Sequence, residues 1–173
     1  MKYTAFTPCF RTESGSYGKE TRGIFRVHQF HKVEQIIFCL PSESEAAHQE
    51  CLVNEEFMMQ QLGLPYRVVD VCVGDMGAPG YRKYDVEAYF PGYGGYREVT
   101  SNTNLTEFQS RRLGIRYKKG DEKGYVHTIS ATAVTDRVAI CIIENFQQED
   151  DSVIIPEALK PFTGFDRIDA PKK

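Results

Sequence analysis

The chain has 173 residues, 41% of them apolar, and a formal net charge of -3 at pH 7. That length and apolar content suit one domain with a real core, and the mild charge gives no reason to expect the strongly basic face of a nucleic-acid-binding module. Because no apolar run approaches the roughly 18 residues that span a bilayer and the start lacks a secretory signal, we expect a soluble, cytoplasmic protein with no membrane association.

Two apolar segments near the start, residues 4–11 and 24–39, are rich in Phe, Val, Ile and Thr and predict strands. The segment between them, Ser14–Arg22, is polar and predicts a loop. We therefore expect the two strands to pair as an antiparallel hairpin.

Three residues of this hairpin have the chemistry of a nucleotide site. Arg11 falls at the end of the first strand, where its planar guanidinium suits bidentate bonding to phosphate. Glu13 lies two residues on and points to the same side of an extended chain, and Phe30 offers a flat face on the returning strand for a base to stack on. These residues predict a binding site for a nucleoside triphosphate. From these residues alone, an ordinary hairpin with a charged tip is an equally good interpretation.

A helix is predicted after Pro41, with Ser42 as its N-cap and an end before Gly63. Its apolar stripe should lie across one face of a sheet and comprises Ala47, Cys51, Met58 and Leu62. Residues Tyr66–Val73 predict the next strand.

Apolar and polar residues then alternate up to Pro91, which predicts a strand with one apolar face made of Tyr84, Val86, Ala88 and Phe90. On the other face, Asp85 and Glu87 form a carboxylate pair of the kind that acid–base chemistry uses. We favour the simpler interpretation, an outward-facing polar surface.

The remaining elements complete the predicted fold. Arg97–Asn102 is a short strand crowded with polar residues, followed by a helix over Glu107–Arg112, a hairpin across Lys119–Gly124, a strand to Ser130 and a helix over Val134–Gln147. Strands in succession with helices inserted predict an α+β fold with a mainly antiparallel sheet flanked by helices.

Several segments together resemble the seryl-tRNA synthetases. Thr7–Ser16, Thr21–Gly23 and Arg26–Glu34 resemble the second signature of that family, and the resemblance continues through Glu98–Asn102 and nearly to the end of the chain. It implies the class II aminoacyl-tRNA synthetase catalytic-domain fold, truncated at the N-terminus. Residues 1–173 would then form a single partial catalytic domain, its C-terminal part, without the coiled-coil tRNA-binding arm.

The resemblance also implies a reaction, in which the domain binds ATP, Mg and L-serine, forms seryl-adenylate and transfers serine to tRNA. Arg11 matches the arginine that bridges the α-phosphate and the serine carboxylate, and it is the catalytic candidate. Since the serine carboxylate is already a nucleophile, no protein base is needed, and catalysis should come from positioning and charge neutralisation.

The residues implied for each ligand are these. Phe30 matches the position on which adenine stacks, and Glu34 the carboxylate that binds serine. Glu98 and Ser101 match the magnesium ligands, for which hard oxygen atoms are suitable. The full ATP set is Arg11, Thr12, Glu13, Val27, Phe30, Glu98, Val99, Thr100, Ser101 and Arg137, and the serine set is Arg11, Glu34 and Thr132.

The third signature departs from the family pattern. Residues Ser130–Arg137 contain one residue fewer than usual, with Thr132 at the serine-contacting position and Arg137 at the arginine that lies over adenine. Removal of one residue from a helix rotates the rest of that helix by about 100 degrees. The sequence therefore leaves the direction of Arg137 open, unless the preceding loop absorbs the change.

Other functions are kept as alternatives. A truncated, non-catalytic synthetase paralogue would keep the fold as a nucleotide-binding or protein-interaction module. A stand-alone ligase that charges a carrier protein ranks last, because its metal-binding residues are not found. A homodimer is left open, since the helix that usually forms the family's dimer interface has no counterpart in the chain.

Overall fold

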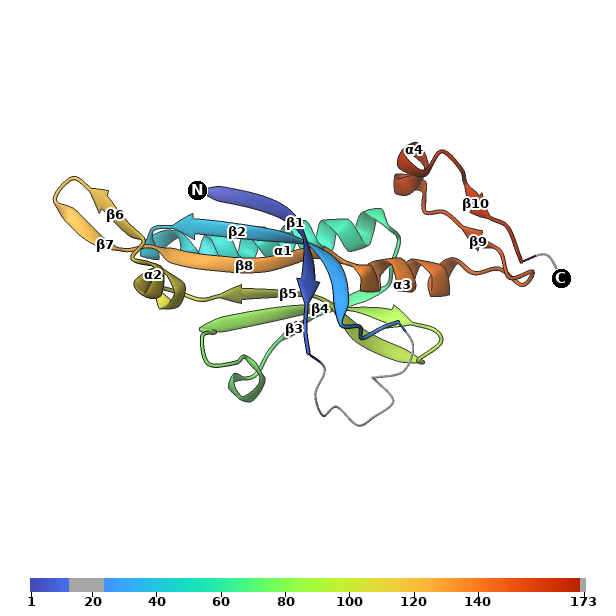
Figure 1. Cartoon of the computed structure of the whole chain (residues 1–173), viewed down its shortest axis with the longest axis horizontal. Helices are drawn as coiled ribbons and strands as arrows, with labels where there is room; N and C mark the ends of the chain where they lie inside the picture. Colours follow the sequence, from blue (N-terminus) through green and yellow to red (C-terminus); the bar gives the residue numbers. More distant parts are fainter. Residues whose placement is uncertain (13–23, 172–173) are drawn as a thin grey trace.

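A six-stranded antiparallel sheet dominates the computed structural model, which describes residues 1–12 and 24–171 (Figure 1). Its strands neighbour one another in the order β1-β2-β8-β5-β4-β3, and every neighbouring pair is antiparallel. The strands are β1 (Lys2–Phe10), β2 (Gln29–Cys39), β3 (Tyr66–Asp70), β4 (Arg82–Phe90), β5 (Gly95–Asn104) and β8 (His127–Thr135). The predicted α+β class and the antiparallel pairing of the first two strands are confirmed, although β2 begins at Gln29 and not at residue 24.

The other elements flank or extend this sheet. The hairpin β6 (Arg116–Lys119) and β7 (Glu122–Tyr125) projects from one end of the sheet, and α4, β9 and β10 lie beyond the other end (Figure 1). Their bounds, with those of the helices, are η2 (Pro41–Glu43), α1 (Ser44–Gln61), η3 (Val73–Asp75), α2 (Phe108–Leu113), α3 (Asp136–Phe146), β9 (Val153–Ile154), η4 (Glu157–Leu159), α4 (Lys160–Thr163) and β10 (Arg167–Ile168).

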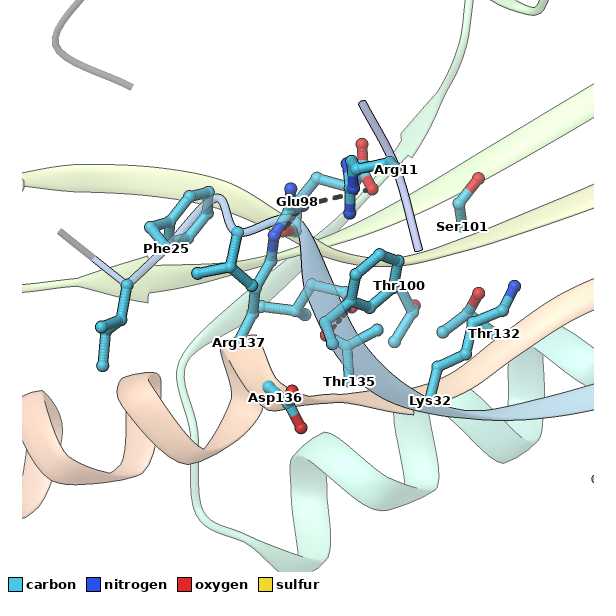
Figure 2. Close-up of a pocket in the computed structure, with 14 residues that line it drawn as sticks. Arg11, Phe25, Lys32, Glu98, Thr100, Ser101, Thr132, Thr135, Asp136 and Arg137 are labelled. Carbon is cyan, nitrogen blue, oxygen red and sulfur yellow. Dashed lines mark hydrogen bonds and ion pairs between the residues drawn. The ribbon is translucent and has the colours of Figure 1, made fainter. Parts of the chain in front are cut away.

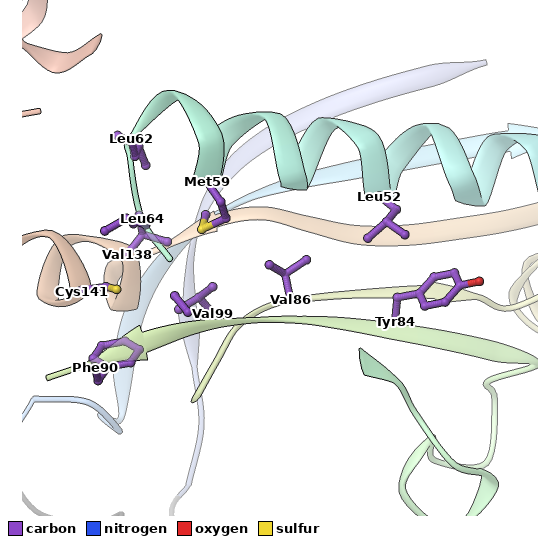
Figure 3. Close-up of a cluster of buried hydrophobic side chains, with 11 residues drawn as sticks. Leu52, Met59, Leu62, Leu64, Tyr84, Val86, Phe90, Val99, Val138 and Cys141 are labelled. Carbon is purple, nitrogen blue, oxygen red and sulfur yellow. The ribbon is translucent and has the colours of Figure 1, made fainter. Parts of the chain in front are cut away.

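The main core lies between α1 and the sheet (Figure 3). Leu52 and Met59 of α1, with Leu62 just after its end, pack with buried residues of the sheet, among them Val86 and Phe90. Burial of such side chains stabilises the fold by roughly 1.5–3 kcal/mol each. The predicted stripe is correct in direction, although Met58 is only partly buried and the neighbouring Met59 is fully buried.

Two polar residues of α1 also face the core, which the apolar pattern does not predict. His48 and Glu55 are both 0% exposed. His48 bonds Asn102 of β5 on one side only: its Nε2 lies 3.1 Å from the Asn102 carbonyl oxygen and the Asn102 amide donates to the His48 carbonyl at 3.1 Å, whereas its Nδ1 has no hydrogen-bond partner among the described residues. The inner face of α1 is therefore apolar with polar insertions.

The starts of two helices differ from the predictions, and the strand predicted over Tyr66–Val73 ends at Asp70. Ser42 is not an N-cap: it lies inside the 3₁₀ turn η2, and the Glu43 carboxylate accepts the Leu40 N–H at 3.1 Å. The predicted helix start at Val134 is wrong, since β8 continues to Thr135 and α3 begins at Asp136. Pairing with β2 keeps this segment extended up to Thr135.

The outward polar face predicted for β4 is wrong for Asp85. This residue is only 8% exposed, and its Oδ2 pairs with Lys83 Nζ at 3.0 Å. Glu87 is more accessible and pairs with Arg67 at 2.6 Å. The face of the sheet opposite α1 is therefore partly covered and charged.

Two β-bulges interrupt the sheet. One shifts the β2–β8 register between Val33 and Glu34, and the other shifts the β4–β5 register between Val86 and Glu87. In the second bulge Val99 is the extra residue, because Glu87 pairs with Glu98 while Val86 pairs with Thr100. No helix among the described residues is long and apolar enough to cross a membrane.

Candidate active site

A cavity of about 170 Å³ opens where β2, β5, β8 and the first turn of α3 meet (Figure 2). Most of the predicted site residues line it, namely Arg11, Val27, Phe30, Glu98, Val99, Thr100, Ser101, Thr132 and Arg137, and Ile24, Phe25, Lys32, Thr135 and Asp136 complete the wall. Thr12 is exposed and does not line the cavity. Glu13 lies outside the described residues.

Arg11 enters the cavity from the end of β1. Its backbone N–H donates to the His28 carbonyl oxygen at 2.9 Å, which continues the β1–β2 pairing by one residue. Its guanidinium carbon lies 4.3 Å from the centroid of the Phe30 ring. A cation over an aromatic face is an attractive arrangement, so the predicted phosphate-binding arginine and the predicted base-stacking ring are neighbours.

Arg137 also points into the cavity, which resolves the question raised by the shortened third signature. Its Nη1 donates to the backbone oxygen of Glu98 at 2.9 Å and lies 3.4 Å from Glu98 Oε1. Its guanidinium carbon lies 4.5 Å from the centroid of the Phe25 ring. The missing residue therefore does not turn this arginine away.

The charges around Arg137 are concentrated and partly buried. Burial is the main cause that lowers the pKa of Arg137, and the nearby positive charges of Arg11, Arg97 and Arg26 add to it. Burial, followed by the negative charge of Asp85, raises the pKa of Glu98. Several guanidinium groups in a restricted space are suited to a polyphosphate.

A second cavity of about 240 Å³ adjoins the first and shares Phe25, Glu98 and Arg137 with it. Arg26 and Arg97 line this second cavity as well. Arg97 lies over the Phe25 ring, with 3.3 Å between the guanidinium carbon and the ring centroid. The sequence interpretation missed Phe25 and Arg97, although both belong to or adjoin the segments that carried the resemblance.

Glu34 lies directly behind two residues of the cavity wall. Its Oε2 accepts from Thr132 Oγ1 at 3.0 Å and pairs with Lys32 Nζ at 2.8 Å. Its Oε1 accepts from Ser130 Oγ at 2.6 Å. The carboxylate is 8% exposed and ordered by three donors, of which Lys32 and Ser130 were not predicted.

Val99 and Thr100 border the cavity, but their side chains are buried, unlike those of their neighbours Glu98 and Ser101. Both side chains are 1% exposed, Val99 lies in the main core, and the Thr100 hydroxyl donates to Glu55 of α1 at 3.3 Å. Side-chain contact with a ligand is therefore left to Glu98 and Ser101 in this segment.

A family model for the tRNA synthetase class II core domain (G, H, P, S and T) matches residues 1–146. With the antiparallel sheet and the arginine-lined cavity described above, the match is decisive: the chain belongs to the class II tRNA synthetase core family.

Within that class the relatives are serine–tRNA ligases, a family of aminoacyl-tRNA ligase enzymes. Those of Pyrococcus furiosus and Treponema denticola are 53% and 50% identical, over 171 and 172 residues. Each alignment covers 97% of this chain but only 38% and 41% of the relative, respectively. The chain thus spans about two fifths of the length of the curated relatives it matches.

Solved structures give the same result for the fold. Seryl-tRNA synthetase from Pyrococcus horikoshii complexed with ATP matches with a TM-score of 0.95 at 46% identity, over 99% of this chain and 39% of that one. Cytoplasmic serine-tRNA ligase from Naegleria fowleri in complex with AMP matches with a TM-score of 0.92 at 40% identity, over 99% and 41%. The predicted class II catalytic-domain fold is confirmed.

Proposed function

We propose that the chain is the ATP- and serine-binding part of a cytoplasmic serine–tRNA ligase, a single partial catalytic domain that forms seryl-adenylate and transfers serine to tRNA. The observation that carries the proposal is the convergence of Arg11, Arg137 and Glu98 on one cavity, with Glu34 buried behind its wall. The structures of relatives with ATP or AMP support it.

In the first step, an oxygen of the serine carboxylate attacks the α-phosphorus of ATP. A phosphorus–oxygen bond forms, the bond to the bridging oxygen breaks, and pyrophosphate leaves with the bonding electrons. Arg11 would hold the carboxylate and the α-phosphate together, which brings two anions into reach by neutralising both. Phe30 would hold the adenine.

The polyphosphate tail would lie over the second cavity. Arg97 and Arg137 line it from β5 and α3, so they would neutralise the charge that develops on the departing pyrophosphate. Arg26 lies in the same wall. This placement gives Arg97, which the sequence interpretation missed, a defined role around the leaving group.

Serine would be recognised by Glu34. The three donors on this carboxylate fix its direction, and an ordered, buried acceptor bonds an ammonium or hydroxyl group with selectivity. Alanine, which lacks the hydroxyl, would leave part of the site unpaired, and an unpaired buried polar group costs about 1–3 kcal/mol. Thr132 would contact the substrate from the same wall.

The oxygen atoms near Glu98 fit a magnesium ion. Asp85 pairs with Ser101 across β4 and β5, and its Oδ1 is buried without a hydrogen-bond partner among the described residues. Glu98 and Ser101 would hold the ion, as the resemblance implies, with Asp85 close by. Magnesium bound with ATP neutralises charge on the phosphate oxygens.

Serine-dependent exchange of labelled pyrophosphate into ATP tests the proposal. We expect exchange by the chain, its loss in Arg11→Ala, and no loss in Arg112→Ala, which removes an exposed arginine of α2 that lines neither cavity. ATP binding without exchange would favour the non-catalytic paralogue. Absence of both binding and exchange would contradict the proposal. Binding of serine tRNA, which the family implies, is measured separately.

A further inference from the structure

Glu55 is a fully buried carboxyl group on the side of the sheet opposite the candidate active site. It lies on the inner face of α1 and is 0% exposed. Thr100 Oγ1 donates to its Oε2 at 3.3 Å, and its Oε1 has no hydrogen-bond partner among the described residues. A buried polar group with so few partners is costly, so its presence calls for an explanation.

The surroundings of Glu55 keep it protonated. Burial is the largest cause that raises its pKa to about 9, and the charges of Glu34, Asp85 and Glu56 act in the same direction. The hydrogen bond from Thr100 opposes them. Cys51, one turn earlier on α1, has its own pKa raised to about 12, mainly by burial. The group that faces Thr100 is thus a neutral carboxylic acid.

The partner of Glu55 sits in the β5 bulge. Successive side chains of a regular strand alternate between its two faces, so Glu98 and Ser101, three residues apart, would point to opposite sides. The extra residue Val99 changes this parity. All four residues border the cavity, but Glu98 and Ser101 keep accessible side chains, whereas Val99 and Thr100 are buried and turn towards the core.

Hydrogen bonds from both sides of the sheet hold the bulge in place. On the cavity side, Arg137 Nη1 donates to the Glu98 carbonyl at 2.9 Å, and Thr135 Oγ1 donates to the Val99 carbonyl at 3.0 Å. On the core side, the only hydrogen bond of the Thr100 side chain within the described residues is the one that it donates to Glu55. The two cavity-side donors belong to residues that a nucleotide would also approach.

We propose that Glu55 is a positioning residue for the nucleotide site: by bonding Thr100 from the core side, it holds the β5 bulge that turns Glu98 and Ser101 together into the cavity. An apolar side chain at this position would leave the Thr100 hydroxyl buried and unpaired. The bulged pairing would then be less favourable relative to a regular register of β5 with β4. In a regular register the side chains of Glu98 and Ser101 point to opposite faces of the sheet. The effect on ATP rests on the function proposed above, whereas the effect on the bulge does not.

The test compares four variants. Glu55→Leu and Thr100→Val each remove one partner of the hydrogen bond, Glu55→Gln keeps a neutral group of the same shape, and Glu50→Ala removes an exposed glutamate of the same helix. We measure the dissociation constant for ATP with magnesium by calorimetry, and the hydrogen exchange of the backbone amides between Glu98 and Ser101.

We expect Glu55→Leu and Thr100→Val to weaken ATP–magnesium binding by roughly tenfold, the loss of about one buried hydrogen bond, and to speed exchange of the bulge amides. Glu55→Gln should restore both measurements to within about threefold of the wild type, and Glu50→Ala should change neither. A positioning role also predicts unchanged ATP binding when magnesium is chelated, because the affected residues are the proposed metal ligands.

Several results would overturn the inference. Unchanged ATP–magnesium affinity and unchanged amide exchange in both Glu55→Leu and Thr100→Val would show that the bulge does not depend on this bond. Failure of Glu55→Gln to restore either measurement would show that the hydrogen bond is not what matters. If the wild-type chain binds no ATP, the proposed function fails, and amide exchange alone still decides the role of Glu55. If Glu55→Leu does not fold, Thr100→Val carries the test.

Discussion

Replacement of Glu55 by glutamine should stabilise the chain, by an amount that grows with pH. Burial raises the pKa of this carboxyl from 4.5 to about 9, so the folded chain binds its proton more tightly than the unfolded chain does. Its contribution to stability is therefore fully present below pH 4.5 and is lost as the pH rises towards 9. At pH 7 the unfolded carboxyl is ionised, and folding must restore its proton.

The magnitude depends on the difference between pH 7 and the unfolded pKa. A gap of roughly 2.5 units at about 1.4 kcal/mol per unit gives roughly 3–4 kcal/mol of lost stability in the wild type at pH 7. Glu55→Gln has no such proton to recover. The free energy of unfolding of Glu55→Gln, relative to that of the wild type, should therefore rise by about 1.4 kcal/mol per pH unit from about pH 5.5 to 8. A difference in packing between the two side chains would add an amount that does not change with pH.

Urea denaturation of both chains at about pH 5, 6, 7 and 8 measures this difference. Because every other titrating group is common to the two chains, the difference between their unfolding free energies isolates Glu55. A difference that stays constant across this range would refute the reasoning, since it would mean that Glu55 is ionised in the folded chain or that its pKa is ordinary.

The core and the two cavities give three more predictions. Phe90→Ala should lower the free energy of unfolding by about 3–5 kcal/mol, while Phe162→Ala, at an 85% exposed position, should change it by less than about 0.5 kcal/mol; equal losses in urea denaturation would contradict the assigned core. Arg97→Gln should raise the dissociation constant of ATP about tenfold and leave that of AMP nearly unchanged, since the arginine lies by the second cavity; calorimetry with both nucleotides checks this, and equal losses would place the tail elsewhere. Glu34→Gln should raise the KM for serine at least tenfold with unchanged ATP affinity, and an unaltered serine response in pyrophosphate exchange would remove Glu34 from the serine site.

The hairpin and the apolar face of β4 were predictable because they depend on local alternation. The pairing of β1 with β2 and the burial of Val86, Ala88 and Phe90 agree with a two-residue period. The convergence of Arg11 with Glu98 depends instead on strands nearly 90 residues apart, and only the resemblance to a known family made it predictable.

The failures have a common physical cause, which is tertiary pairing that local patterns do not contain. Val134 belongs to a segment that looks helical, but pairing with β2 holds it in β8. Asp85 looks like a solvated residue, but neighbouring side chains cover it. The direction of Arg137 was open because a deletion near a helix start has no defined outcome until the preceding strand and its bulge are known.

The bulge at Val99 has a consequence for the length of the chain. A deletion of one residue usually inverts every side chain on one side of it in a strand. Removal of Val99 would leave the side chains on both sides of the deletion facing as they do now. It would convert β5 into a regular strand in which Glu98 and Ser101 are two residues apart and still share a face. Deletion of Val99 is therefore the one-residue change in β5 that should keep the side chains of Glu98 and Ser101 on the same face, towards the cavity.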